Sequence, residues 1–221
     1  MIDHLRRIVN DLVATHGTPI TVALDGPSGA GKSTVARALA IATAGVLVPS
    51  DDFFAAQLTR AEWDARSPME RARDAIDWGR LRRCAIEPLR AGKRAVWHPF
   101  DFGAGERDDG SYAMATHVEQ REPAPVIIID GAYSARPELA DLLDLTVLVD
   151  APESVRHARL EAREEAAFLQ AWHERWDDAE RYYFGQVRPI ESFDVVVDVV
   201  TGSVQDRRRT GPLGPLLPNG L

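Results

Sequence analysis

The run Gly26–Ser33 has the residue types and the spacing that bind a phosphate chain. It reads GPSGAGKS, a full match to the pattern G-x-x-x-x-G-K-[ST]. The apolar run Ile20–Leu24 before it predicts a buried strand, and the alanine-rich run Thr34–Ala42 after it predicts a helix. A glycine-rich turn between a strand and a helix can aim backbone N–H groups at an anion. The alternative is a strand-to-helix turn that binds nothing, and the complete motif in this context argues against it.

The last two positions of this run predict the ligand. Lys32 would reach the β- and γ-phosphates of a nucleotide, and the Ser33 hydroxyl would bind Mg²⁺. The sequence contains no Asn-Lys-x-Asp run for reading guanine. We therefore predict ATP and Mg²⁺ as cofactors. The expected nucleotide-binding residues are Gly26, Ser28, Gly29, Ala30, Gly31, Lys32, Ser33 and Thr34.

Carboxylates follow two other predicted strands. Asp130 ends the most apolar run, where a protein with this loop places the acid that holds Mg²⁺, although it could instead cap a helix or form a turn. Asp51 and Asp52 end the strand Val46–Val48. A carboxylate there could orient an acceptor hydroxyl and take its proton. Either acid could instead cap the next helix, which is our preferred interpretation for Asp52.

Three arginines recur at helical spacing near the C-terminal third of the chain. Arg156, Arg159 and Arg163 are three and four residues apart and therefore share one helix face. Guanidinium groups match phosphate oxygens, so this face could stabilise a transferred phosphoryl group. The glutamates between and after them leave a second interpretation open, a surface helix with ion pairs.

Composition limits the function classes. The chain has 221 residues, 45% of them hydrophobic, and a net charge of −8, which favours one globular domain and a small-molecule ligand over nucleic acid. The single cysteine, Cys84, rules out a disulfide framework. The charged N-terminus is unlike a secretory signal, and no apolar run is long enough to span a bilayer. We expect a cytoplasmic protein that binds no membrane; a homo-oligomer is left open.

Helical and strand patterns alternate along the chain. Helices are expected around Leu5–Val13, 34–42, 69–91 and 152–185, and strands at 20–24, 46–48, 94–98, 112–118, 126–130, 145–150 and 195–197. This alternation predicts an α/β fold, a three-layer sandwich with a mostly parallel sheet and helices on both faces. One domain would cover residues 1–204, with a hairpin insert at 93–118, and residues 205–221 would form a tail.

At these residues the sequence resembles the uridine kinase and phosphoribulokinase family of P-loop kinases. The resemblance rests on four features besides the fold pattern. They are the phosphate loop, the string Asp51–Phe54 (DDFF, similar to Asp-x-Phe-[Tyr/Phe]), the string Phe100–Phe102 (FDF) followed by Arg107, and the spaced arginines of 152–185. Nicotinamide riboside kinases have nearly the same string as Asp51–Phe54.

The resemblance implies a role for each of these residues. Asp51 would be the catalytic base, the hairpin 93–118 would cover the substrate, and the region 152–185 would form a helical lid. Asp77 matches, by position, an acid that binds ribose hydroxyls. The implied catalytic residues are Lys32, Asp51, Arg159 and Arg163, and the implied substrate-binding residues are Asp51, Phe54, Asp77, Phe100, Asp101 and Arg107.

Two departures from the family pattern bear on the acceptor. Phe100 replaces a tyrosine and Gly105 replaces a histidine, and both of the replaced residues hydrogen-bond the pyrimidine in uridine kinases. A site without these partners should discriminate poorly for uracil. The expected function is transfer of the ATP γ-phosphate to a hydroxyl of a small nucleoside-like metabolite. The alternatives are a sugar, aminoglycoside-like or vitamin acceptor, and a P-loop ATPase or switch protein that acts on a protein partner.

Overall fold

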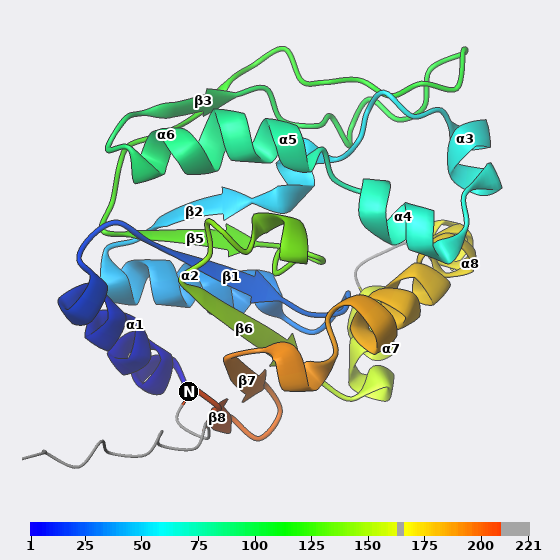
Figure 1. The fold of residues 1–221 in the computed structure, drawn as a ribbon. Coiled ribbons are helices and arrows are strands. Elements are labelled where there is room, and N and C mark those ends of the chain that lie inside the picture. Colours follow the sequence, from blue (N-terminus) through cyan, green and yellow to red (C-terminus); the bar gives the residue numbers. More distant parts are fainter. Residues whose placement is uncertain (163–165, 209–221) are drawn as a thin grey trace, which may run out of the picture.

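A six-stranded sheet runs through the middle of the computed structural model, which describes residues 1–162 and 166–208 (Figure 1). The strand order is β2-β5-β1-β6-β7-β8, and all neighbours are parallel except β7 and β8. The strands are β1 (Ile20–Asp25), β2 (Val46–Pro49), β5 (Val126–Asp130), β6 (Leu145–Asp150), β7 (Val195–Asp198) and β8 (Val204–Asp206). The predicted α/β class with a mostly parallel sheet is confirmed.

The central strands form because their side chains are apolar on both faces. Every residue of β1 and β5 is buried, as expected for parallel strands covered by helices on both sides. The register pairs Leu24 with Asp130 and Pro49 with Asp130. The carboxyl ends of β1, β5 and β2 therefore lie together at one edge of the sheet, where open α/β sheets bind their ligands.

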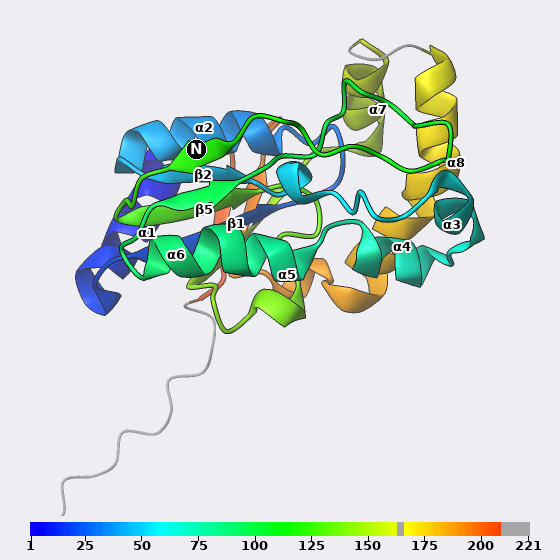
Figure 2. The ribbon, with the colours of Figure 1, turned by 90° about the horizontal axis from the view of Figure 1, so that it is seen from above.

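Helices cover the two faces of the sheet (Figure 2). Residues of α1 (Ile2–His16) and α2 (Lys32–Thr43) share one hydrophobic core with one face of β1, β5 and β6. The opposite core contains α5 (Trp78–Leu81), a π-helical segment (Arg82–Ile86) and α6 (Glu87–Arg90). This arrangement is the predicted three-layer sandwich.

The predicted helix over 69–91 is interrupted. The structure has α4 (Pro68–Asp74), an extended link, and then α5. In the link, Ile76 forms an antiparallel bridge with Phe54, and the Asp77 N–H donates to the Phe53 carbonyl. Backbone hydrogen bonds to the segment after β2 therefore override the helical periodicity of this sequence.

The hairpin differs from its predicted strands. β3 (Ala95–Trp97) matches, but it pairs with β4 (Glu119–Arg121) and not with residues 112–118. Pro99 ends the ladder because it has no N–H, and its carbonyl accepts from the Ala115 N–H. Only isolated bridges, such as Phe100 with Met114, continue the arm beyond this point within the part of the chain that is described.

The lid region is helical on either side of residues 163–165. α7 (Glu153–Glu161) and α8 (Ala166–Tyr182) lie side by side at one end of the sheet (Figure 2), and a π-helical segment (Tyr183–Val187) follows. α3 (Arg60–Ala65) and α4 lie at the same end, and α4 packs against α8.

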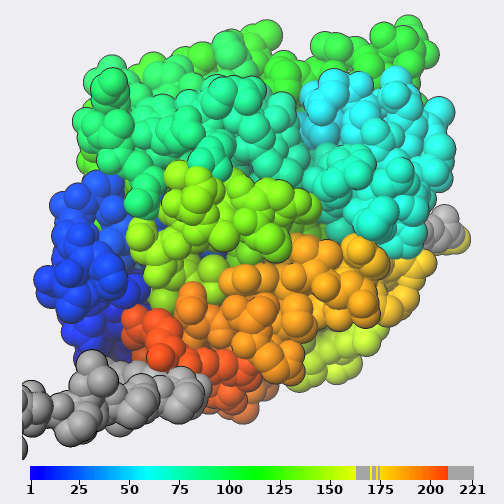
Figure 3. All heavy atoms as spheres, in the orientation of Figure 1, coloured from blue at the N-terminus to red at the C-terminus, as the bar shows by residue number. Residues whose placement is uncertain are grey.

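The C-terminal strand was missed by the sequence analysis. β8 pairs with β7, so the predicted tail from residue 205 begins inside the sheet. Its three residues, VQD, carry too little apolar pattern to indicate a strand. The N-terminal helix and this C-terminal strand lie next to each other on the surface (Figure 3). Residues 209–221 lie outside the described part.

Candidate active site

The loop Gly26–Ser33 joins β1 to α2 at the carboxyl edge of the sheet. Gly29 has a φ of +76°, and a Cβ there would stand 2.6 Å from the carbonyl oxygen of Arg156. Only glycine therefore fits this position without strain. Lys32 donates to the Pro27 carbonyl at 3.0 Å, which folds its ammonium over the loop. Ser28 and Gly31 line the same loop, Ala30 is buried, and Ser33 and Thr34 are exposed in the first turn of α2.

Asp130 lies beside this loop, as predicted, at the end of β5. It is 6% exposed, and its Oδ1 has no hydrogen-bond partner among the described residues. Burial raises the pKa of Asp130, while a hydrogen bond with Ser33 and the charges of Lys32 and Arg37 act in the opposite direction. A buried carboxylate oxygen without a partner costs free energy, and it is the kind of ligand that Mg²⁺ prefers.

Asp51 and Asp52 follow β2 in a 3₁₀ turn, Ser50–Phe53, and point to different surroundings. Asp51 is exposed, and its Oδ1 lies 3.5 Å from the place that a Cβ of Gly131 would occupy. The Asp51 carboxylate therefore lies at the end of β5, one residue beyond Asp130.

The prediction that Asp52 caps the next helix is wrong. Its carboxylate accepts a hydrogen bond from Trp97 Nε1 at 2.8 Å, and the next helix, α3, is capped by Thr59. Burial raises the pKa of Asp52, and the Trp97 hydrogen bond opposes this. The Asp52 carbonyl accepts from the Phe100 N–H and from Arg80, so this residue fastens the hairpin to the sheet.

Two of the three lid arginines contact the phosphate loop. Arg156 donates to the Ser28 carbonyl at 3.2 Å, and Arg159 donates to the Ala30 carbonyl at 3.0 Å. The predicted shared helix face is thus the face turned to the loop. Arg163 lies outside the described residues.

Glu180, on α8, is a contact that sequence analysis missed. Its buried carboxylate accepts from both the N–H and the hydroxyl of Ser28, at 2.9 and 2.6 Å. Arg156 lies 3.8 Å from the same carboxylate. Several acids occur on this helix, and nothing in their spacing distinguishes Glu180.

Asp25, the last residue of β1, is a second missed residue. It is fully buried and accepts from the N–H groups of Gly26, Tyr133 and Ala135 and from the Tyr183 hydroxyl. Burial raises the pKa of Asp25, and these hydrogen bonds oppose the shift. Asp25 thereby ties the start of the phosphate loop to the segment after β5. The sequence feature that could have identified Asp25 is its position as an acid at the end of a buried strand.

Of the other polar residues implied for substrate binding, Asp77 and Asp101 have local side-chain hydrogen bonds. The Asp77 carboxylate caps α5 by accepting from the Arg80 N–H at 2.8 Å. Asp101 Oδ1 accepts from the N–H groups of Gly103 and Ala104, both at 3.0 Å. Arg107 is exposed in the loop of the hairpin. Asp77 and Asp101 therefore have structural roles whether or not a substrate binds there.

Phe54 and Phe100 belong to an aromatic cluster between the hairpin, α3 and α8. The Phe54 ring lies 4.9 Å from that of Phe100 and 5.9 Å from that of Trp176. Phe100 is 8% exposed, whereas Phe102, beside it, is 64% exposed. The cluster consists of Phe54, Trp63, Phe100, Phe102, Tyr112 and Trp176.

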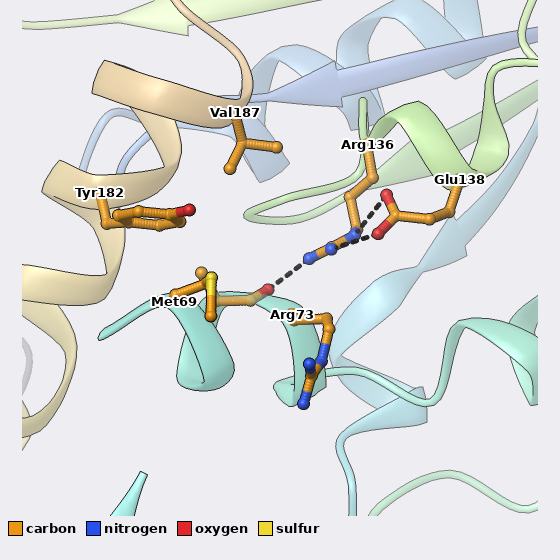
Figure 4. A pocket seen from close by; sticks show the side chains of 7 residues that line it. Met69, Arg73, Arg136, Glu138, Tyr182 and Val187 are labelled. Atoms are coloured by element: carbon orange, nitrogen blue, oxygen red, sulfur yellow. Dashed lines mark hydrogen bonds and ion pairs between the residues drawn. The ribbon is translucent and has the colours of Figure 1, made fainter. Parts of the chain in front are cut away.

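A pocket between α4, the segment after β5 and the end of α8 contains none of the predicted site residues (Figure 4). Arg136 crosses it, with its guanidinium held by Glu138 at 2.7 Å and by the Ala72 carbonyl. Its lining residues are Met69, Ala72, Arg73, Arg136, Glu138, Tyr182 and Val187, and none of them is a predicted site residue.

Comparison with known proteins identifies the family. A family model described as "AAA domain" matches residues 22–185, which is most of the chain, and the chain therefore belongs to this family. The matched residues include the phosphate loop, Asp51 and Asp130. No curated protein gives a significant match. No helix within the described residues is long and apolar enough to cross a membrane.

Three solved structures are similar in fold. One is described as a possible uridine kinase from Bacillus stearothermophilus (20% identity, TM-score 0.61, 88% of this chain and 100% of that one). Another is described as a "putative fructose transport system kinase" from Silicibacter sp. TM1040 (22%, 0.63, 85% and 95%). The third is the YGR205w protein (12%, 0.59, 93% and 98%). These similarities confirm the P-loop kinase fold that the sequence resemblance implied.

Proposed function

We propose that this AAA-domain protein is an ATP- and Mg²⁺-dependent kinase that phosphorylates a hydroxyl of a small, nucleoside-like metabolite. One observation carries the proposal: three groups that phosphoryl transfer needs meet at the carboxyl edge of adjacent strands. The phosphate loop follows β1, the buried Asp130 ends β5, and Asp51 follows β2. A fold with a phosphate loop alone would not require the third group.

The metal-binding residues in this proposal are Ser33 and Asp130. The Asp130 Oδ1 that lacks a partner fits a divalent cation, because a cation would compensate the buried charge. Mg²⁺, when bound, would neutralise charge on the β- and γ-phosphates. Lys32 and the N–H groups of the loop would hold the phosphate chain.

Asp51 would supply the base for transfer. It would accept the proton of the acceptor hydroxyl while the acceptor oxygen bonds to the γ-phosphorus. The bond from that phosphorus to the β–γ bridging oxygen breaks, and ADP leaves with the electron pair. Asp51 is exposed at the end of β2 and lies against Gly131, so it can reach a substrate that Asp52, held by Trp97, cannot.

The lid arginines would act on the transferred group. Arg159 already contacts the loop carbonyls, so a small shift of its guanidinium would bring it to a γ-phosphate. The same role is predicted for Arg163. Guanidinium groups in this position stabilise charge on the equatorial oxygens.

The acceptor would bind between Asp51 and the hairpin. Asp101, Arg107 and the aromatic rings of Phe54 and Phe100 are the candidate contacts there, and Asp77 is a weaker one because it caps α5. Phe100 offers no hydroxyl, and at Gly105 a Cβ would meet no atom within 4 Å. We therefore expect uridine and cytidine to be poor substrates.

A direct assay distinguishes a kinase from a P-loop switch protein that acts on a protein partner. The names of two structural neighbours, a possible uridine kinase and a fructose transport system kinase, support a kinase but differ in acceptor. ATP consumption should be measured with and without nucleosides, sugars, amino-polyols and vitamins. A kinase consumes ATP quickly only with its acceptor. Fast hydrolysis without any acceptor, increased by a protein partner, would instead support the switch protein.

A further inference from the structure

Two histidines and an aspartate meet between the helices of the lid. His157 lies on α7, and His173 and Asp177 lie on α8. One ligand atom from each lies within 4.8 Å of the others. The His157 and His173 rings are 4.9 Å apart, and Asp177 is 3.0 Å from His173 Nδ1. All three side chains are only partly exposed.

The spacing of these residues matches a metal site on a helical hairpin. His173 and Asp177 are four residues apart on one helix face, a spacing at which two side chains can bind the same ion. On α7, Glu153 is four residues before His157, and its carboxylate is 3.7 Å from His157 Nε2. Each helix thus carries a pair of potential ligands at this spacing, and Glu153 lies next to the three-residue cluster without belonging to it.

The distances need little adjustment to hold an ion. Two ligand atoms bound tetrahedrally to one Zn²⁺ at roughly 2.0–2.1 Å stand about 3.3 Å apart. The His173–Asp177 separation is already close to this value. Side-chain rotation can close the remaining gap to His157, because the site lies at the surface of the lid.

The donor types define the class of metal. Imidazole nitrogens favour Zn²⁺, Co²⁺ or Ni²⁺, whereas Mg²⁺ prefers oxygen ligands. We therefore expect the cluster of His157, His173 and Asp177 to select a different ion from the Ser33–Asp130 pair. We propose that His157, His173 and Asp177 form a transition-metal site that fastens α7 to α8.

Such an ion would act on the position of the lid. α7 carries Arg156 and Arg159, which contact the phosphate loop, and α8 carries Glu180, which binds Ser28. An ion bound between the two helices would hold both sets of contacts in one arrangement. This inference does not depend on the proposed kinase activity.

Cobalt titration of the nucleotide-free protein tests the site. Tetrahedral Co²⁺ absorbs visible light much more strongly than octahedral Co²⁺, so binding here gives its own signal. Wild type should develop this band, and Zn²⁺ should abolish it, while millimolar Mg²⁺ should not. His157→Ala and His173→Ala should each weaken Co²⁺ binding at least tenfold.

The matched control is His117→Ala, another surface histidine near a glutamate. It should titrate like wild type. Circular dichroism should show that every variant is folded. The proposal is overturned if wild type gives no tetrahedral band, or if the band survives in both His157→Ala and His173→Ala.

Discussion

The proposed nucleotide side and the proposed acceptor side of the site are built differently. On the nucleotide side, the candidate groups lie at the ends of buried parallel strands, and backbone geometry fixes them. Asp130 follows four buried apolar residues, and Gly29 fits against the backbone of α7. On the acceptor side, Asp101 and Arg107 lie in a polar loop whose strands are short.

From this difference we expect the strand ends to govern phosphate binding and transfer, and the hairpin to govern which acceptor binds. Strand ends hold groups at fixed positions, which a transferred phosphate requires. Loops vary more freely and commonly determine which ligand binds. We therefore expect substitutions on the nucleotide side to abolish turnover with every acceptor, and substitutions in the hairpin to change which acceptor is used.

The largest effect is expected for Lys32→Ala. Turnover should fall below detection with all acceptors, because the charge that we propose to contact the phosphate chain is lost. The sequence has one other lysine, the exposed Lys93, and Lys93→Ala is the matched control. Steady-state ATP consumption measures both. Near wild-type turnover by folded Lys32→Ala would contradict the account.

Asp51 and Asp52 are adjacent acids with different expected roles, so substituting each in turn compares a proposed catalytic group with a structural one. Asp51→Asn should lower kcat by ~10²–10⁴, the usual contribution of a positioned base, with ATP affinity little changed. Asp52→Asn should leave kcat nearly unchanged and cost little stability, because an Asn oxygen can still accept from Trp97 Nε1 and folding already favours the neutral form of this part-buried acid. Kinetics and urea unfolding distinguish the two. A larger kinetic loss for Asp52→Asn than for Asp51→Asn would show that Asp51 is not the base.

The pH dependence tests Asp130. Its pKa is raised by burial, and it must be ionised to hold Mg²⁺. Mg²⁺-dependent stabilisation by an ATP analogue should therefore be present above the raised pKa and disappear as the pH falls through it, at a higher pH than for an ordinary aspartate. Asp130→Asn should remove the Mg²⁺ response at all pH values.

The same raised pKa predicts the sign of the stability effect. A raised pKa means that folding favours the protonated form, so ionisation at neutral pH weakens the apo protein. Asp130→Asn, which mimics the neutral form, should keep or increase the Tm without Mg²⁺. Asp198→Asn, at the end of β7, is a control of opposite sign: hydrogen bonds from Thr201 and Val200 lower the pKa of Asp198, so loss of its charge should lower the Tm. A clear loss of Tm in Asp130→Asn as well would indicate a structural role.

A further stability effect concerns the contact of the loop with the lid. Gly29 and Gly17 have similar φ values, +76° and +81°, but a Cβ on Gly17 would meet no atom within 4 Å. Gly17, with a ψ of −171°, lies in a region that almost only glycine adopts, so Gly17→Ala should cost about 1–3 kcal/mol from backbone strain. Gly29→Ala should cost more, because its Cβ would clash with the Arg156 carbonyl. Equal losses in urea unfolding would show that the lid does not rest on the loop in solution.

The sequence indicated the positions of the phosphate loop and of Asp130 well because its signals there are local. The loop motif, the strand before it and the apolar run ending in Asp130 each lie within a few consecutive residues. Contacts between distant segments were not readable. The bridge between Ile76 and Phe54 breaks a helix that the periodicity predicted, and β4 begins at Glu119, directly after the expected strand 112–118.

Individual polar contacts between residues far apart in the chain could not be predicted from the sequence either. Asp52 resembles a capping residue in sequence, yet its partner Trp97 is 45 positions away. Glu180 reaches Ser28 across 152 positions. Local patterns carry no information on such pairs, because the fold as a whole brings them together.

The central claim is that Asp51 and the phosphate loop together transfer phosphate to a small hydroxylated acceptor. Transfer of radiolabel from [γ-³²P]ATP to a panel of nucleosides, sugars, amino-polyols and vitamins tests it most directly. The account predicts a labelled small-molecule product with wild type, none with Lys32→Ala, and a greatly slowed yield with Asp51→Asn. Release of labelled inorganic phosphate at the same rate in wild type and Asp51→Asn, with no labelled acceptor, would contradict it.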